Sequence, residues 1–219
     1  MRELIINGLF LLDGGVSLVL AILGGIIFSY LLGSVNFSIL LTRMAGKPDI
    51  RTFGSGNAGA TNMLRTYGKK LAILTLFLDM VKGAAAAFLG LVLLPMDDFA
   101  YVCVFFCLLG HAYPCYFGFR GGKAVATSFG AILVLNPIVG ILLVIVFFLV
   151  AMMSHYVSVA SMLSLLLFPL LNQKIPFYSA PPFFVVKMII SVLIPALVIF
   201  LHRKNIVRLL HGEEVKMES

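Results

Sequence analysis

The 219-residue chain is too apolar to form a soluble domain with an ordinary charged surface. Hydrophobic residues make up 61% of it, charged residues only 11%, and its mean hydropathy is +1.10, whereas a soluble domain carries about 25% charged residues. The net charge of +7 favours anionic headgroups or anionic substrates. Because the cations are divided among short segments, nucleic acid is not an expected partner.

Two long uncharged stretches indicate helices that cross a membrane. Residues 14–42 contain no Asp, Glu, Lys or Arg, and residues 124–173 continue the pattern for 50 residues. One crossing needs about 20 apolar residues, so the second stretch is too long for one helix. The first follows Asp13 and exceeds the apolar core of a signal peptide, which predicts a retained helix.

The sequence predicts an all-α, polytopic membrane protein with one domain over residues 1–219. We expect seven crossings, at residues 14–36, 71–94, 99–117, 124–135, 137–153, 157–171 and 183–201. The turn at Asn136 and Pro137 ends the fourth, because proline cannot continue a helical hydrogen-bond ladder. The fourth segment reaches only about 18 Å. The alternative has five crossings, with the fourth and fifth segments forming a re-entrant pair.

The cations predict which ends of these helices face the cytoplasm. Residues 43–70 hold six Lys and Arg, residues 120–123 hold two, and residues 203–216 hold four. The positive-inside rule places these three segments in the cytoplasm. The N-terminus is then outside and the C-terminus inside.

The first cytoplasmic segment, residues 49–62, has the composition of an anion-binding loop. It combines three glycines with neutral hydrogen-bond donors and one forked cation: Gly54, Gly56, Gly59, Ser55, Asn57, Thr61, Asn62 and Arg51. Glycine leaves backbone N–H groups unshielded, and a guanidinium suits phosphate. The alternative is a flexible, solvated turn. Residues 54–59 also fit G-x-G-x-x-G, but a helical membrane chain lacks the βαβ unit that this fingerprint requires.

Two further cationic segments are candidates for the same site. Residues 117–123 resemble a phosphate loop at the start of a helix, although Phe117 and Ala124 depart from the Walker A pattern. A simple positive anchor for that helix is the alternative. In the C-terminal tail, which should continue the last crossing, His202, Asn205 and, less closely, Arg208 share a helix face. An ordinary solvated helix end would explain the charges but not the His/Asn pair.

Asp79, Lys82 and His111 are further candidate residues within predicted crossings. Asp79 and Lys82 lie three residues apart on one helix face. Ionised groups at membrane depth usually pair or line a polar cavity, so a purely structural ion pair remains an alternative to a substrate contact. For His111 we expect a local capping role.

The motifs resemble those of the acyl-phosphate:glycerol-3-phosphate acyltransferases, which begin bacterial phospholipid synthesis. In order along the chain they are Gly33-Ser34, residues 49–62 with Arg65, Asp79 to Gly83, Leu109 to His111, Phe119 to Lys123, and His202 to Ile206 with Gly212-Glu213. The resemblance implies acyl transfer from acyl phosphate to the sn-1 hydroxyl of glycerol 3-phosphate. The products would be lysophosphatidic acid and inorganic phosphate, without a cofactor or metal.

The resemblance also implies a set of site residues. The catalytic residues would be Arg51, Ser55 and Lys123. The substrate-binding residues would be Ser34, Gly56, Asn57, Thr61, Asn62, Lys82, Gly121, Gly122, His202 and Asn205. Arg51 and Lys123 would offset phosphate charge, Ser55 and glycine N–H groups would bind phosphate oxygens, and Asn205 with His202 would position the acceptor. Glu213 would be structural.

The implied setting is the cytoplasmic side of a bacterial inner membrane. The partners would be the two substrates, membrane lipid and, in transient contact, the enzyme that makes acyl phosphate. Three departures from the family pattern are Asn36 in place of proline, Ala124 in place of glycine and Lys204 in place of glutamate. The alternative function is a transporter of small phosphate-bearing anions, with the basic loops as its gate.

Overall fold

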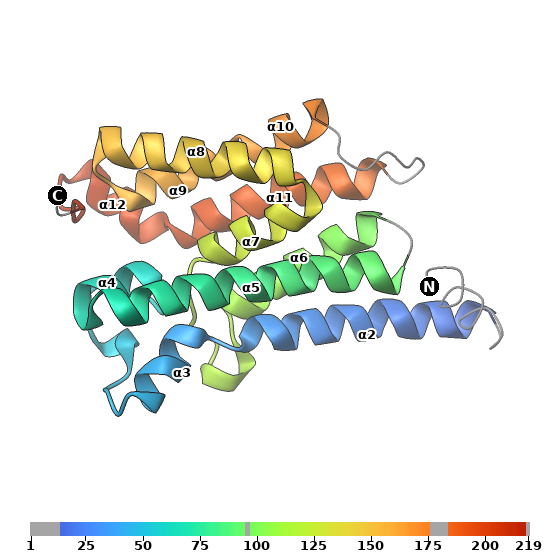
Figure 1. The fold of residues 1–219 in the computed structure, drawn as a ribbon, viewed down its shortest axis with the longest axis horizontal. Helices are drawn as coiled ribbons and strands as arrows, with labels where there is room; N and C mark the ends of the chain where they lie inside the picture. Colours follow the sequence, from blue (N-terminus) through green and yellow to red (C-terminus); the bar gives the residue numbers. More distant parts are fainter. Residues whose placement is uncertain (1–13, 95–96, 176–183, 218–219) are drawn as a thin grey trace.

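The computed structural model describes residues 14–94, 97–175 and 184–217, which form a bundle of antiparallel helices. Its elongated segments lie side by side along the length of the bundle (Figure 1). Their helices are α2 (Gly14–Ser34), α5 (Lys69–Leu93), α6 (Asp97–Ala112), α7 (Val125–Leu135), α8 (Pro137–Ser154), α9 (Val157–Leu166) with α10 (Phe168–Lys174), and α11 (Phe184–Leu201). Short α3 (Phe37–Met44), α4 (Ala60–Tyr67) and α12 (Arg203–Leu210) lie at the end that carries the C-terminus.

Every predicted crossing contains helix in the described residues. The bounds differ most for the crossing predicted at 99–117, because α6 ends at Ala112, and for the one predicted at 157–171, which is divided into α9 and α10. Within the part of the chain that the structure describes, five helical segments are long and apolar enough to span a membrane, and a sixth qualifies if α11 and α12 count as one span. The predicted fourth crossing is α7, whose 11 residues reach only about 16 Å. Integral membrane architecture is therefore clear, while α7 alone does not have the length of a span.

Glycine allows the central helices to approach closely. A Cβ on Gly83 of α5 would lie 2.0 Å from the Thr127 carbonyl oxygen of α7, and one on Gly130 of α7 would lie 2.0 Å from the Met80 carbonyl oxygen. Small residues at such contacts replace the hydrophobic driving force that lipid cannot supply. The short α7 is thus held against α5 and covered by α8.

A neutral polar cluster holds the bundle together at the end opposite the C-terminus. The Asn136 Oδ1 atom caps α8 by accepting from the Val139 N–H, and its Nδ2 donates to Ile175 O at 2.7 Å and Asn172 Oδ1 at 3.3 Å. The Tyr101 hydroxyl donates to the same Asn172 oxygen. The predicted Asn136–Pro137 turn is confirmed. The loop predicted from residue 172 begins later, because α10 continues to Lys174 and residues 176–183 lie outside the described part.

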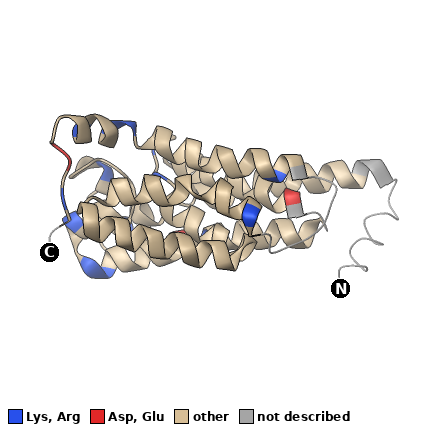
Figure 2. Cartoon of the chain, turned by 90° about the horizontal axis from the view of Figure 1, so that it is seen from above, with Lys and Arg blue, Asp and Glu red and all other residues tan. Residues whose placement is uncertain are grey.

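The cations gather mainly at the other end of the bundle, as Figure 2 shows. Two short amphipathic helices there, α3 and α4, were not predicted from the sequence. The prediction that the tail continues the last crossing was wrong in direction, because α12 is inclined by 56° to α11 across His202. This bend turns α12 toward the loops that contain the other candidate residues.

Candidate active site

The first loop, residues 49–62, is organised from within by Asn62 at the start of α4. The Asn62 Nδ2 atom donates to the carbonyl oxygens of Ile50, Phe53 and Asn57, and its Oδ1 accepts from the Ser55 N–H at 3.1 Å. A buried amide with this many internal partners fixes the loop. Asn62 therefore shapes the loop that carries Ser55 and Asn57.

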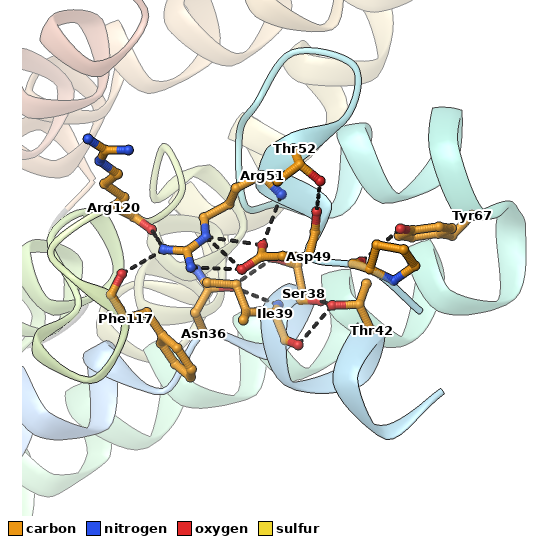
Figure 3. A network of polar contacts seen from close by, with 11 residues as sticks. Asn36, Ser38, Ile39, Thr42, Asp49, Arg51, Thr52, Tyr67, Phe117 and Arg120 are labelled. Carbon is orange, nitrogen blue, oxygen red and sulfur yellow. Dashed lines mark hydrogen bonds and ion pairs between the residues drawn. The ribbon is translucent and has the colours of Figure 1, made fainter. Parts of the chain in front are cut away.

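Arg51 joins the first loop to the second, residues 117–123. Its guanidinium contacts both Asp49 oxygens, with Nη2 to Oδ2 at 2.7 Å, and Nη1 donates to Phe117 O at 2.6 Å and Arg120 O at 3.1 Å (Figure 3). The hydrogen bond from the Arg51 side chain holds the pKa of Asp49 below its usual range. A planar five-donor fork can make these contacts simultaneously, which a lysine could not do.

The glycines of the second loop are needed for space. The Gly121 N–H donates to Ala112 O at 3.0 Å and the Gly122 N–H donates to His111 O at 3.1 Å. A Cβ on Gly122 would lie 2.1 Å from His111 Nε2, and one on Gly121 would lie 2.0 Å from His111 O. These two N–H groups already have main-chain acceptors, which argues against their predicted role of binding phosphate oxygens.

The Gly56 N–H in the first loop also has a main-chain acceptor, which argues against its predicted binding of a phosphate oxygen. Its N–H donates to Phe53 O at 2.9 Å, and its φ of +69° is the left-handed conformation that glycine adopts readily. Glycine is therefore needed at position 56 because the turn requires a positive φ. Ala124 also has a left-handed φ, +59°, immediately before α7. A non-glycine residue is strained there.

Lys123 is a half-buried cation at the centre of the site. Its Nζ donates to Asn205 Oδ1 of α12 at 2.5 Å. Asn205 Nδ2 in turn donates to Glu214 Oε1 at 2.6 Å, and the same carboxylate accepts from Ser158 Oγ at 3.0 Å and Arg208 Nε at 2.8 Å. We call Lys123, Asn205, Glu214, Ser158 and Arg208 the charged cluster.

Burial controls the protonation of the charged cluster. It lowers the pKa of Lys123 to about 8, with Arg208 and Arg65 acting in the same direction and Glu214 opposing them. Burial also opposes ionisation of Glu214, but hydrogen bonds from Arg208, Asn205 and Ser158 outweigh it and hold the pKa of that carboxyl below its usual range. Lys123 is therefore a cation that small changes in its surroundings can neutralise.

His202 is oriented by the end of α11. Its Nδ1 lies 2.8 Å from Val198 O, a carbonyl that can only accept, so Nδ1 carries the proton. In the neutral ring, Nε2 is then a hydrogen-bond acceptor. His202 is 3% exposed and borders the same pocket as Asn205.

Two pockets of opposite character meet at the ends of the loops. The first, of about 300 Å³, is mainly apolar and lies among α4, α5, α7, α8 and α9; it includes Leu76, Met80, Phe129, Val144, Phe147 and Phe148. The second is lined by polar and cationic residues, including Arg51, Arg120, Arg203, Lys204 and Arg208. Both pockets are bordered by Ser55, Asn57 and Lys123.

This combination of fold and pockets can be compared with known proteins. A family model described as glycerol-3-phosphate acyltransferase matches residues 23–212. The chain belongs to this family. It is 38% identical over 203 residues to the glycerol-3-phosphate acyltransferase of Finegoldia magna, covering 91% of this chain and 97% of the relative. It is 40% identical over 198 residues to that of Syntrophomonas wolfei, covering 88% and 95%.

A solved structure extends the family relation to the fold. The crystal structure of PlsY, an integral membrane glycerol 3-phosphate acyltransferase, in its glycerol 3-phosphate form matches with a TM-score of 0.82 and 34% identity. The match covers 90% of this chain and 96% of that one. The lysophosphatidic acid form of PlsY matches with a TM-score of 0.80 at the same identity.

In this family member, most of the predicted site residues border one of the two pockets. The apolar pocket is bordered by Thr61, Asn62, His202 and Asn205, and the cationic pocket by Arg51, Gly56, Gly121 and Gly122. Asp79 and His111 also border the apolar pocket. The His111 carbonyl accepts from the Gly122 N–H, but the His111 Nδ1 atom has no hydrogen-bond partner among the described residues, so the local capping role expected of this side chain stays a prediction.

Ser34 and Lys82 border neither pocket. Ser34 is fully buried, and its hydroxyl donates to Tyr30 O at 2.9 Å and accepts from the Cys115 N–H at 3.4 Å. Lys82 is 2% exposed and engaged by Asp79 and Val35 O. Their positions argue against direct substrate contact, because both side chains are buried against protein groups.

The structural role expected of Glu213 in the tail belongs to its neighbour. Glu213 is exposed, whereas the next residue, Glu214, makes the buried contacts. Ser158 was missed as well, since a single serine in an apolar helix has no distinguishing pattern. Only the folded arrangement, in which the tail crosses the start of α9, brings Ser158 to Glu214.

Proposed function

We propose that this chain transfers a fatty acyl group from acyl phosphate to the sn-1 hydroxyl of glycerol 3-phosphate. The products are lysophosphatidic acid and inorganic phosphate. The single observation that carries the proposal is the junction at Ser55, Asn57 and Lys123, where an apolar pocket meets a cationic one. A reaction that joins a lipid chain to a charged headgroup requires such a junction, and family membership supplies the acceptor class.

The cationic pocket suits the phosphate-bearing ends of the substrates. Arg51, Lys123 and Arg208 bring positive charge from three different segments. Two unit charges about 4 Å apart interact by roughly 4 kcal/mol at an effective dielectric of 20. Ser55 adds a neutral donor at the junction. Charge stabilisation of this kind is strongest in a site already arranged before substrate arrives.

The apolar pocket suits the acyl chain and offers it a route from the bilayer. Leu76 of α5 and Phe148 of α8 border it and are 45% and 60% exposed. Because both side chains face outward, the pocket opens between these helices toward the lipid-facing side. Phe129 of α7, which is 7% exposed, lies at its inner wall. An acyl chain can enter here while its phosphate remains near Lys123.

The chemistry then needs orientation more than a protein nucleophile. The acceptor hydroxyl oxygen attacks the carbonyl carbon of the mixed anhydride, and the new ester bond forms. The bond from that carbon to the phosphate oxygen breaks, phosphate leaves with the electron pair, and a phosphate oxygen accepts the hydroxyl proton. Lys123 and Arg51 offset the phosphate charge. His202 Nε2 and Asn205, beside the junction, position the acceptor.

We propose the membrane setting from the distribution of the cations. The cationic end faces the cytoplasm of a bacterial inner membrane, and seven segments cross with the N-terminus outside, α7 being the short one. Trypsin should cleave near Lys69 and Lys70 in inverted vesicles and leave these sites intact in spheroplasts. Cleavage there in spheroplasts alone would contradict the orientation.

Purified protein should make lysophosphatidic acid from acyl phosphate and glycerol 3-phosphate alone, without added metal. Acyl-CoA and acyl carrier protein donors serve as comparisons in parallel reactions. Product from either of these but not from acyl phosphate would overturn the proposed donor. Flux of glycerol 3-phosphate into proteoliposomes without any acylated product would favour a transporter.

A further inference from the structure

Three titratable side chains are buried together beneath the two loops. Asp79 and Lys82 of α5 are each 2% exposed, and His111 of α6 is 3% exposed. Lys82 Nζ lies 2.8 Å from Asp79 Oδ1, and His111 Nδ1 lies 3.6 Å from the same oxygen. Burying ionised groups is costly, and apolar side chains of similar size would close the bundle at least as well. Their presence therefore needs a reason beyond packing.

Lys82 connects this cluster to the segment that leads into the first loop. Its Nζ donates to Val35 O at 2.8 Å, at the break between α2 and α3, and lies 5.5 Å from the centroid of the Phe37 ring. The next residue, Asn36, caps α3 and donates from Nδ2 to Ala58 O of the first loop at 3.4 Å. Lys82 thus fixes the position of Val35, and the adjacent Asn36 contacts the first loop.

His111 connects the cluster to the second loop. Its carbonyl accepts from the Gly122 N–H, and its ring lies so close to Gly122 that a Cβ there would be 2.1 Å from Nε2. Lys123 is the next residue. The same Gly122 faces Ala58 O, which a Cβ would approach to 2.6 Å. The first loop, the second loop and the imidazole therefore meet at one point.

Asp79 lies between these two connections. Among the described residues, neither Asp79 Oδ1 nor His111 Nδ1 has a hydrogen-bond partner with good geometry, and both residues border the apolar pocket. Asp79 Oδ1 faces both the Lys82 ammonium and the His111 imidazole. A carboxylate in this position can orient Lys82 and His111 together.

We propose that Asp79, Lys82 and His111 form a positioning cluster that sets the first loop and Lys123 at the separation required for acyl transfer. The three side chains act through Val35, Gly122 and the main chain that follows them. This inference rests on the proposed function for its reaction. A misplacement of about 1 Å at a reacting group can cost about 100-fold in rate, so the cluster should control turnover more than substrate affinity.

The test compares a charge-neutral double variant with single variants. Asp79→Asn alone leaves the Lys82 charge unpaired and should lower the Tm. Asp79→Asn combined with Lys82→Met removes both charges, so the Tm should return to within a few degrees of wild type. The double variant should still have a kcat at least tenfold lower, with KM for glycerol 3-phosphate changed less than threefold. A wild-type kcat in the double variant would overturn the proposal.

His111→Ala gives a second measurement that involves no buried charge. Its matched control is Cys103→Ala, two turns earlier on α6, where Cys103 is fully buried against Leu94 and Phe99. His111→Ala should lower kcat at least tenfold, while Cys103→Ala keeps it within twofold of wild type. Equal losses in both variants would mean that packing of α6 explains the effect, and an unchanged kcat in His111→Ala would also overturn the proposal.

The choice of donor separates this inference from the proposed function. All variants are assayed with the acyl donor that the wild-type protein uses. If wild type uses acyl-CoA or acyl carrier protein instead of acyl phosphate, the proposed donor fails and the comparison of variants still decides the role of the cluster.

Discussion

The two ends of the bundle solve the burial of polar side chains in different ways. At one end, Asn136, Asn172 and Tyr101 satisfy one another and the ends of α8 and α10 without any charge. At the other, the charged cluster contains a lysine whose pKa is lowered to about 8 and which borders both pockets. Neutral, internally satisfied groups stabilise a fold. A half-buried cation that borders a pocket remains available to a ligand.

This contrast makes Lys123→Ala the most damaging single change for activity. It removes the cation shared by both pockets, and loss of one charge-stabilising group typically costs 100- to 1,000-fold in rate. We expect kcat/KM to fall by about 1,000-fold, measured as lysophosphatidic acid formed, with a cooperative unfolding transition retained. Lys70→Ala, an exposed cation at the same end, should change kcat/KM less than twofold. Comparable losses in both would remove the special role of Lys123.

Glu214→Gln tests whether the tail positions Asn205 and Lys123. The change keeps the shape but removes the charge that accepts from Arg208 and Asn205. A hydrogen bond to a charged group contributes about 1.5–3 kcal/mol, so kcat/KM should fall roughly 10- to 100-fold. Glu213→Gln is the matched control, because Glu213 is exposed. If Glu213→Gln had the larger effect, the assignment of the tail glutamate would be wrong.

Asn136→Ala should affect stability and leave the chemistry intact. It removes the cap of α8 and leaves the Ile175 carbonyl without its Asn136 donor. Loss of a cap costs about 1 kcal/mol and an unsatisfied buried group about 1–3 kcal/mol, so a loss of about 2–4 kcal/mol in unfolding free energy is expected. Thermal unfolding and kcat are measured on the same sample below the transition. A large loss of kcat without loss of stability would contradict the purely structural role of the end that contains Asn136.

Ala124→Gly should produce the smallest effect, and it should be stabilising. Ala124 has a φ of +59°, where an alanine is strained and a glycine is not. Part of this gain is offset by the greater freedom of glycine in the unfolded chain. A net increase of about 1 kcal/mol or less in unfolding free energy is expected, measured as a higher Tm. A lower Tm would mean that the Cβ contributes more by packing than it costs in strain.

Much of the fold was predictable because the lipid environment imposes long apolar helices. The predicted segments at 14–36 and 137–153 match α2 (Gly14–Ser34) and α8 (Pro137–Ser154) closely. The 56° bend at His202 and the short helices α3 and α4 were not predicted. These features depend on contacts between segments far apart in sequence, which local hydropathy does not contain.

The site was predictable where residue type sets its chemistry and obscure where packing sets it. Lys123 and Asn205 were identified from the motifs and are in direct contact. The glycines at 121 and 122 were interpreted as amide donors, yet their N–H groups bind main-chain carbonyls and their missing Cβ atoms admit His111. A glycine in the sequence indicates equally well an N–H group free to bind a ligand and a position where two backbone segments pack closely.

The most direct test of a cationic Lys123 at the junction is the pH dependence of kcat/KM. The free enzyme should lose kcat/KM as pH rises through about 8, since the lowered pKa makes Lys123 neutral well before an ordinary lysine. Lys123→Arg should move this alkaline decline above pH 10, because arginine stays protonated. An identical decline near pH 8 in both proteins would contradict the account, since another group would then control the reaction.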